Sequence, residues 1–302
     1  MAQKVLITGG SGLVGKQLSK LLLEQGYEVA WISRTAGDTG KIKSYAWDLK
    51  NKHIDIKAFE NVTSIIHLAG AGIADERWTD TRKKELIDSR VESTKLLLEY
   101  VEKLNIPLKA FISSSAIGYY GGNTGNEPKD EYSQPGHDFL AEVCKVWEDE
   151  AMKFEQNKVR TVCIRTGIVL NSAGGALPKL AIPIQFGIGT YLGDGNQWMS
   201  WIHLADVCHI YLKALEDENL QGVYNATAPN PVTNKTFTQI LAKQLKKWVL
   251  PLYAPAFLFK ILLGEMAVVV TGSSHVLCKR LSETDFVFKF RTLEEALKDI
   301  YK

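Results

Sequence analysis

A glycine-rich turn near the start of the chain constrains its fold more than any other feature. The apolar run at residues 5–8 leads into Gly9, Gly10, Gly12 and Gly15, and an apolar periodic segment follows. This order predicts a strand, a tight turn and a helix whose free N–H groups face an anion. We expect the turn to bind the pyrophosphate of a dinucleotide. The residues expected to contact it are Gly9, Gly10, Ser11, Gly12, Leu13, Val14 and Gly15.

The glycines of this turn have separate predicted roles. Gly9 lets the chain turn sharply, Gly12 lets backbone approach a bulky anion, and Gly15 lets the helix pack tightly on the strand. Their spacing is Gly-x-x-Gly-x-x-Gly rather than Gly-x-Gly-x-x-Gly. In this spacing the chain resembles the short-chain dehydrogenase/reductase superfamily, and in particular its extended, epimerase-like branch.

Composition narrows the class of protein and of partner. The chain has 302 residues and a net charge of +2, without a basic cluster interleaved with aromatic residues. We therefore expect a small-molecule partner and neither nucleic acid nor a membrane.

The four cysteines are far apart and the histidines lack metal-ligand spacing, so we expect free thiols, no metal and a reducing compartment. An early strand leaves no room for a signal peptide, which favours a cytoplasmic protein. The sequence does not decide whether it forms a homodimer.

Strand and helix patterns alternate along the first three quarters of the chain. Strands are predicted at residues 4–8, 28–33, 44–47, 64–68, 110–114, 160–165 and 223–225, and helices at 14–24, 81–103, 139–154 and 204–216. Several strands are continuous apolar runs, which are typical of a parallel sheet buried on both faces. The alternation predicts an α/β fold with a doubly wound, Rossmann-type parallel sheet that binds ligands at the carboxyl ends of its strands.

The two parts of the predicted fold differ in size. We expect a dinucleotide-binding domain at residues 1–228, with inserted substrate-side segments near 170–200. We expect a small, mainly helical C-terminal lobe at 229–302, ending in an amphipathic helix at 292–301.

The end of the second predicted strand bears on the choice of cofactor. An acidic residue there would accept a hydrogen bond from the ribose 2′-hydroxyl of NAD, but this chain has Ser33 and Arg34. A guanidinium suits a 2′-phosphate, so NADP(H) is favoured over NAD(H). The alternative for Arg34 is an exposed side chain without a ligand. The resemblance further implies an adenine contact at Asp48 and Leu49, and a loop beside the cofactor at Leu68, Ala69 and Gly70.

The superfamily's catalytic residues match this chain only in part. Ser115 corresponds to the serine that binds the reacting oxygen. The Tyr-x-x-x-Lys pair that exchanges the proton falls on Leu140 and Cys144, and neither can do this in the usual way. Tyr119 and Tyr120, which closely follow the serine, are the remaining candidates for the proton donor, with a structural wall as the alternative role.

The resemblance covers nearly the whole chain, which is similar to the atypical, epimerase-like group that includes bacterial YfcH-like proteins. Matching segments lie at residues 9–15, 87–91, 114–121, 139–148, 165–170, 193–197, 201–206 and 286–297, and a segment of unknown function is expected at about 249–298. The group generally lacks the Tyr/Lys pair. Further residues expected at the cofactor are Arg90, Ser113, Ser114, Arg165, Thr166 and Gly167. For Arg90, an anion clamp and an ordinary salt-bridge partner are both open.

Two functions remain open from the sequence. The resemblance implies an NADP(H)-binding, epimerase-like oxidoreductase that acts on an unidentified small molecule, such as a sugar nucleotide or a carbonyl compound. The alternative is a non-catalytic NADP(H)-binding sensor or scaffold, which the missing Tyr/Lys pair supports.

Overall fold

The structure is a computed structural model, and it describes residues 3–302. Its central layer is a sheet in the order β13-β8-β7-β6-β1-β2-β4-β3, with β5 paired to β4. The first seven strands of this order are parallel to one another. They are β13 (Gly222–Ala226), β8 (Arg160–Thr166), β7 (Ala110–Ala116), β6 (Val62–His67), β1 (Lys4–Thr8), β2 (Glu28–Ser33) and β4 (Lys43–Asp48). The short β3 (Gly37–Asp38) and β5 (His53–Ile54) are antiparallel to β4.

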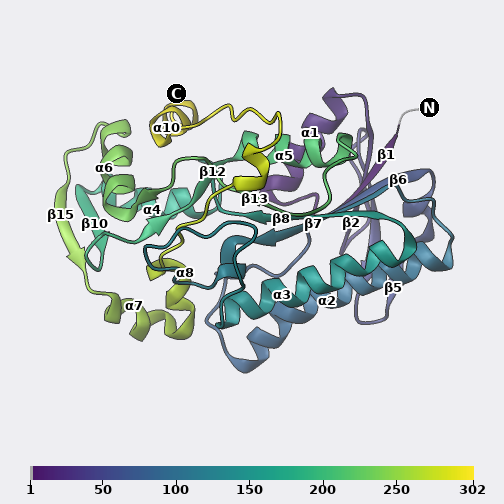
Figure 1. Cartoon of the computed structure of the whole chain (residues 1–302), viewed down its shortest axis with the longest axis horizontal. Coiled ribbons are helices and arrows are strands. Elements are labelled where there is room, and N and C mark those ends of the chain that lie inside the picture. Colours follow the sequence, from purple (N-terminus) through teal and green to yellow (C-terminus); the bar gives the residue numbers. More distant parts are fainter. Residues whose placement is uncertain (1–2) are drawn as a thin grey trace.

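Helices cover both faces of this sheet (Figure 1). On one face α1 (Leu13–Glu24) packs beside α5 (Leu204–Glu216), and on the other α2 (Asp80–Lys103) packs beside α3 (Phe139–Ala151). The 3-10 helices are η1 (Ile56–Phe59), η2 (Ile117–Tyr120), η3 (Met152–Asn157) and η4 (Gly264–Met266). The predicted doubly wound α/β fold is confirmed, because apolar strands such as β1 lie buried between two helical layers.

The order of the strands reverses beside β1. The chain places β2 and β4 on one side of β1 and β6, β7, β8 and β13 on the other. Thr8, at the end of β1, lies in register with Ile32 of β2 and His67 of β6. The loops that follow these three strands therefore meet at one edge, where ligands bind in sheets of this kind.

A smaller part of the molecule is built from two separate stretches of sequence. Strands of the 168–203 region pair with one another or with later strands: β9 with β12, β10 with β15, and β11 with β14. These elements are β9 (Ile168–Leu170), α4 (Ala176–Gln185), β10 (Ile188–Leu192), β11 (Trp198–Met199), β12 (Trp201–His203), β14 (Val232–Thr233), α6 (Asn234–Gln244) and β15 (Leu250–Ala254). The chain then forms α7 (Ala256–Leu263), α8 (Ala267–Thr271), α9 (Lys279–Ser282) and α10 (Leu293–Ile300).

The smaller part has a core of its own. Large side chains from its strands and helices are buried together, among them Trp201, Phe237 and Leu297. Gly174 and Gly175, just before α4, approach the Leu13 side chain at the start of α1. This part of the molecule therefore borders the glycine-rich turn.

Candidate functional site

The glycine-rich turn has the form that an anion site requires. The N–H of Gly12 donates to the carbonyl oxygen of Gly9 at 3.0 Å, and Gly9 has a φ of +69°. Gly12 is the N-cap residue of α1, and among residues 3–302 no side chain caps this helix end. The first N–H groups of α1 are thus available to a ligand, together with the positive end of the helix dipole. Gly12 is exposed, so this end of the helix is open.

Two other glycines in the turn are required by close packing. A Cβ atom on Gly10 would lie 2.3 Å from the Trp31 ring, and one on Gly15 would lie 2.4 Å from the carbonyl oxygen of Gly9. Trp31 is fixed by a hydrogen bond from its Nε1 to Ser19 Oγ at 2.8 Å. Gly15 therefore packs against the backbone of the turn at Gly9 and Gly10.

At the end of β2, the side chain of Ser33 is hydrogen-bonded within the protein and that of Arg34, the next residue, is exposed. Ser33 Oγ donates to the carbonyl oxygen of Thr35 at 2.6 Å and lies 3.0 Å from Ser44 Oγ. Arg34 is exposed, and within residues 3–302 its side chain forms no hydrogen bond or ion pair. Arg34 is thus the cation at the end of β2 that an anionic ligand could reach.

Asp48, at the end of β4, closes its own turn. Its Oδ1 accepts hydrogen bonds from the backbone N–H groups of Lys50 and Asn51, and its Oδ2 accepts one from Asn51 Nδ2. These bonds hold the pKa of Asp48 below its ordinary value. The turn also sets the position of the half-buried Leu49. A contact with an adenine would be additional to this local role.

The loop after β6 is joined directly to the glycine-rich turn. The N–H of Leu68 donates to the Thr8 carbonyl oxygen at 3.1 Å, and that of Ala69 donates to Thr8 Oγ1 at 3.2 Å. A Cβ on Gly9 would approach both Leu68 and Ala69 to 3.0 Å. His67 is buried between Thr8 and Ser93, and burial lowers its pKa to about 3. His67 is therefore a neutral structural residue.

Arg90 projects from α2 toward this loop. Its Nη1 donates to the Leu86 carbonyl oxygen at 2.8 Å and its Nη2 donates to the Ala71 carbonyl oxygen at 3.0 Å. Its guanidinium carbon lies 4.9 Å from the centre of the Trp147 ring and 3.1 Å from where a Cβ of Gly70 would be. No carboxylate within residues 3–302 forms an ion pair with it, and burial lowers its pKa. The geometry thus leaves a partly buried positive charge beside Gly70 for an anion to neutralise.

Ser115, Tyr120 and Arg165 belong to one buried polar network. Ser115 is 2% exposed, and its Oγ donates to Glu148 Oε1 at 2.5 Å. Arg165 forms a two-point ion pair with Glu148, at 2.8 Å from Nε and 2.7 Å from Nη2, and its Nη1 donates to the Tyr120 hydroxyl at 2.9 Å. The Tyr120 hydroxyl donates to Asn225 Oδ1 at 2.8 Å. These side chains join β7, η2, α3, β8 and β13 to one another.

The network binds the hydroxyls of Ser115 and Tyr120 within the protein, whereas a reactive hydroxyl would be free to contact a substrate. Burial raises the pKa of Tyr120 to about 12, and its oxygen is engaged by both Arg165 and Asn225. The Ser115 hydroxyl is committed to a carboxylate. In this arrangement both groups bind the protein itself.

Tyr119 is placed differently from its neighbour. Its ring stacks on the Arg165 guanidinium, whose carbon lies 3.3 Å from the ring centre, and the side chain is half-buried. Within residues 3–302 its hydroxyl has no hydrogen-bond partner. Of the three catalytic candidates, Tyr119 is the one whose oxygen remains free for another group.

The remaining predicted residues lie at the ends of β7 and β8. Ser113 Oγ donates to the Ser114 carbonyl oxygen at 3.0 Å. Ser114 and Thr166 face the hydroxyl of the buried Tyr211 on α5. The N–H of Gly167 donates to the Ala226 carbonyl oxygen, and a Cβ there would lie 2.5 Å from the Ser200 carbonyl oxygen. Gly167 is thus required by contact between backbones.

The positions of the absent acid/base pair form a packed, apolar region. A Cβ on Gly118 of η2 would lie 3.4 Å from Leu140 Cβ and 3.5 Å from Cys144 Sγ. Leu140 packs in a cluster with Trp78, Phe139 and Met266. Burial raises the pKa of Cys144 to about 12, so this thiol is neutral. Met266 brings the C-terminal part of the chain into contact with the position where the superfamily has its tyrosine.

The partners that organise the site were not predicted from the sequence. Glu148 and Asn225 anchor the buried network, and Trp31 excludes a side chain at Gly10. The sequence did contain a signal for the carboxylate partner of Arg165. Arg165 lies near the end of an apolar strand, and a buried guanidinium requires a carboxylate partner.

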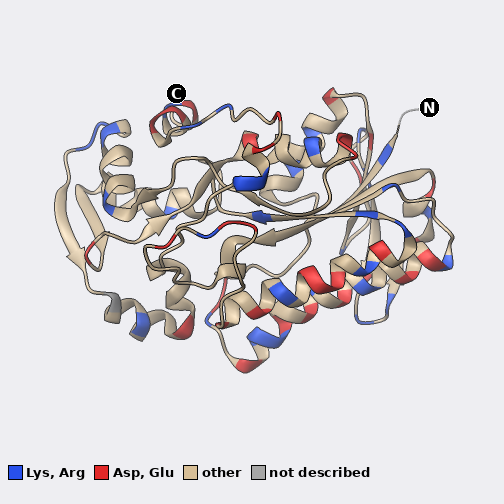
Figure 2. Ribbon diagram, viewed as in Figure 1, with Lys and Arg blue, Asp and Glu red and all other residues tan. Residues whose placement is uncertain are grey.

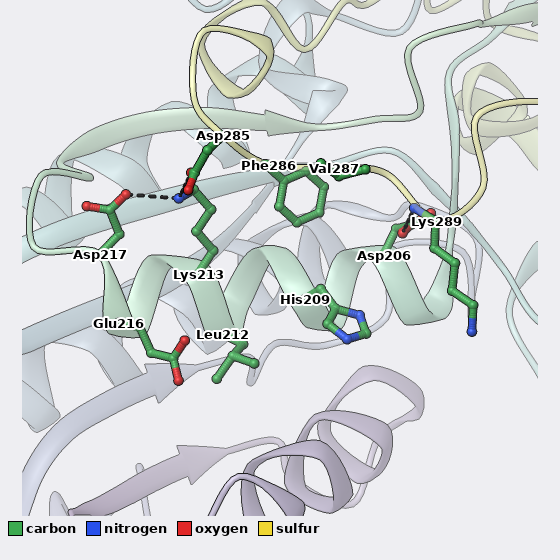
Figure 3. Close-up of a pocket in the computed structure, with 10 residues that line it drawn as sticks. All are labelled: Asp206, His209, Leu212, Lys213, Glu216, Asp217, Asp285, Phe286, Val287 and Lys289. Carbon is green, nitrogen blue, oxygen red and sulfur yellow. Dashed lines mark hydrogen bonds and ion pairs between the residues drawn. The ribbon is translucent and has the colours of Figure 1, made fainter.

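A well-defined surface groove lies away from these residues. It is an open groove of about 560 Å³ between α5 and the 285–289 segment (Figure 3). Lys213 crosses part of it to pair with Asp217 and Asp285. None of the predicted site residues lines this groove, so it is not the candidate site.

Within residues 3–302 we find no cluster of His, Cys, Asp or Glu suited to a metal ion. Over the same residues, no helix has the length and apolar character needed to cross a membrane.

Comparison with known proteins agrees with this geometry. Residues 5–227 match the NAD dependent epimerase/dehydratase family, and residues 254–300 match a domain of unknown function, DUF1731. An epimerase family protein of Staphylococcus aureus is 34% identical over 302 residues, which cover 99% of each chain.

Solved structures show the same similarity. The structure of the human epimerase family protein SDR39U1 with NADPH is 29% identical, covers 99% of each chain and has a TM-score of 0.87. A nucleoside-diphosphate sugar epimerase from Corynebacterium glutamicum is 32% identical with a TM-score of 0.80, and covers 99% of this chain and 59% of that one. Since the family match extends over most of the chain, and its epimerase-like NAD(P)-binding fold carries the glycine turn at the strand edge, this chain belongs to the NAD dependent epimerase/dehydratase family.

Proposed function

We propose that this protein binds NADP(H) at the carboxyl edge of its sheet. The observation that carries the proposal is the uncapped start of α1 behind an exposed Gly12, which leaves N–H groups for a pyrophosphate. The human relative whose structure contains NADPH supports it. When bound, the cofactor supplies a hydride donor or acceptor. The turn at Gly9–Gly10, the loop at Leu68–Gly70 and the side chain of Arg34 are the groups that would hold it.

Arg34 is the proposed basis of the preference for NADP(H) over NAD(H). We expect wild-type protein to bind NADP(H) more tightly by roughly 1–3 kcal/mol, because Arg34 can form charge-assisted bonds to a 2′-phosphate. In Arg34→Ala the two affinities should become nearly equal, as measured by calorimetric titration. Lys41→Ala, which removes another exposed cation a few residues away, serves as the matched control and should keep the preference. Equal affinities in the wild type would contradict the proposal.

For the reaction, we propose an epimerase-like oxidoreductase that acts on a small molecule such as a sugar nucleotide or a carbonyl compound. Tyr119 is assigned as the group that moves a proton, because its hydroxyl is free and the adjacent Arg165 favours a developing negative charge. Arg90 is assigned to an anionic group of the ligand, since it lacks a carboxylate partner within residues 3–302.

Removing the Tyr119 hydroxyl should reduce turnover with little effect on stability. Tyr119→Phe keeps the ring on Arg165 and should lower the turnover rate by about 10²–10⁴-fold, the usual contribution of a general acid or base. The measurement is NADPH oxidation in a screen of carbonyl compounds and sugar nucleotides. Tyr120→Phe and Ser115→Ala are the matched comparisons. They should lower the melting temperature, because both hydroxyls are bound in the buried network. Unchanged turnover in Tyr119→Phe would exclude this role.

A second function is favoured by the apolar region at Leu140 and Cys144. A protein that binds NADP(H) as a sensor or scaffold has no need of a proton relay, and these positions hold a packed leucine and a neutral thiol. If the wild type binds NADP(H) but is silent in the screen, this function is supported. A gain of carbonyl reduction in the Leu140→Tyr, Cys144→Lys double variant would support it further.

A further inference from the structure

Most of the large apolar side chains that are exposed to solvent lie at one end of the molecule. Apart from Ile56, Tyr132 and Val287, every exposed large hydrophobic residue among those described lies between residues 182 and 270. Trp248 is 81% exposed and Phe186 is 78% exposed. We define the apolar end as Phe186, Ile188, Trp248, Leu250, Leu252, Tyr253, Phe257, Leu258, Ile261 and Leu262. A soluble surface rarely gathers so many large apolar side chains without a partner.

The apolar end is continuous across adjoining elements. The strand β15 pairs in parallel with β10, and the N–H of Leu250 donates to the Gly187 carbonyl oxygen at 2.9 Å, so Trp248 and Phe186 lie close together. The helix α7 follows β15 directly and packs on η4 and α8. Figure 1 shows β15 and α7 together at the end of the molecule far from β1.

The helix α7 presents an apolar stripe to solvent. Phe257 and Ile261 are four residues apart, as are Leu258 and Leu262, so each pair lies on one side of the helix. All four are exposed. Lys260 is the only charged residue in the helix.

All the charged side chains of the stretch that contains β15 and α7 are positive. Residues 219–264 contain five lysines, at positions 235, 243, 246, 247 and 260, and no Asp or Glu. The chain carries +2 overall and +5 in this stretch, which leaves −3 for the rest. Figure 2 shows blue segments at the end of α6 and on α7, on either side of the uncharged β15. Glu265, the first residue after this stretch, is acidic and pairs with Lys83.

We infer that the apolar end docks on the surface of an anionic phospholipid bilayer. Its aromatic and aliphatic side chains would enter the headgroup region, and Lys243, Lys246, Lys247 and Lys260 would contact lipid phosphates. The attachment is peripheral, since α7 has only eight residues. A second copy of the chain is the poorer partner, because a symmetric contact would bring two lysine-rich surfaces together. The sequence expectation of no membrane partner rested on a net charge that averages over this asymmetry.

Vesicle binding tests this inference with the full-length protein. We expect it to cosediment with phosphatidylcholine vesicles that contain phosphatidylserine, and to bind vesicles of phosphatidylcholine alone at least about 100-fold more weakly, because the attraction of four lysines to the anionic surface is then lost. Ile261→Ser with Leu262→Ser, and separately Lys243→Gln with Lys246→Gln and Lys247→Gln, should each reduce binding to anionic vesicles by about tenfold or more.

A matched control uses apolar residues exposed elsewhere. Ile56→Ser with Val287→Ser should leave vesicle binding unchanged, since neither residue belongs to the apolar end. Circular dichroism establishes that every variant folds. Absence of binding to anionic vesicles would overturn the inference. So would a dimer in solution that the Ile261→Ser, Leu262→Ser variant converts to a monomer, since a second copy would then be the partner.

Discussion

Glu148→Ala is expected to lower the free energy of unfolding by about 3–5 kcal/mol, the usual cost of removing one partner of a buried ion pair. Arg165 would be left buried with its charge uncompensated, and the Ser115 hydroxyl would lose its acceptor. The measurement is the midpoint of urea unfolding at constant m-value. This is the largest stability effect that we expect from a single polar substitution in the chain.

The control for this prediction lies on the same helix. Glu142 is exposed in the first turn of α3, so Glu142→Ala should cost no more than about 1 kcal/mol. A second variant, Glu148→Gln with Arg165→Met, removes both charges and should recover part of the lost stability. If Glu148→Ala were as mild as Glu142→Ala, the network would not stabilise the fold.

The fold was predictable because its signals are local. Alternating apolar runs and helical periodicity define the parallel sheet, and the predicted bounds of β1, β2 and α5 agree with the structure. Predictions were less accurate where local signals compete. The predicted helix at 139–154 is an α-helix only to Ala151 and then tightens into η3, and β7 continues past Ser114 to Ala116.

Of the candidate site, only the backbone conformation of the glycine-rich turn was predictable from the sequence. The glycine turn follows from spacing alone, because its conformation depends on neighbouring residues in the chain. The role of Ser115 could not be read in this way. Its match to a family position says where the serine lies, but the acceptor of its hydroxyl is Glu148, 33 residues later on another element. That contact depends on how α3 packs on the sheet.

The exposed apolar surface and the positive charge of the C-terminal part were not predicted, for a different reason. Whole-chain averages of charge and composition conceal the separation between a stretch with five lysines and a slightly acidic remainder. The exposure of α7 and β15 is a tertiary property as well, since an apolar run of this length is equally typical of a buried core helix. Figure 2 makes the separation visible only because the elements are placed in space.

Gly12→Val is expected to weaken NADP(H) binding by about 100-fold or more while the protein stays folded. The backbone of Gly12 has φ −74° and ψ 177°, an extended conformation that valine adopts without strain. A Cβ there has only the Gly9 carbonyl oxygen nearby, at 3.3 Å, so the fold should need little adjustment. The added methyl groups would instead occupy the space before the N–H groups of α1. Losing about two charge-assisted hydrogen bonds there, at roughly 1.5–3 kcal/mol each, accounts for the effect.

A control variant must distinguish weaker cofactor binding from unfolding of α1. Gln17→Val places the same side chain on the exposed side of α1, where it should cost a few tenths of a kcal/mol of stability and leave cofactor affinity unchanged. Affinity is measured by calorimetric titration with NADPH, and folding by the melting temperature without cofactor. A Gly12→Val protein that melts normally and binds NADPH as the wild type does would show that the dinucleotide lies elsewhere. Gly9→Val would be a poor substitute for this test, because its φ of +69° makes any β-branched residue strained whether or not a ligand binds.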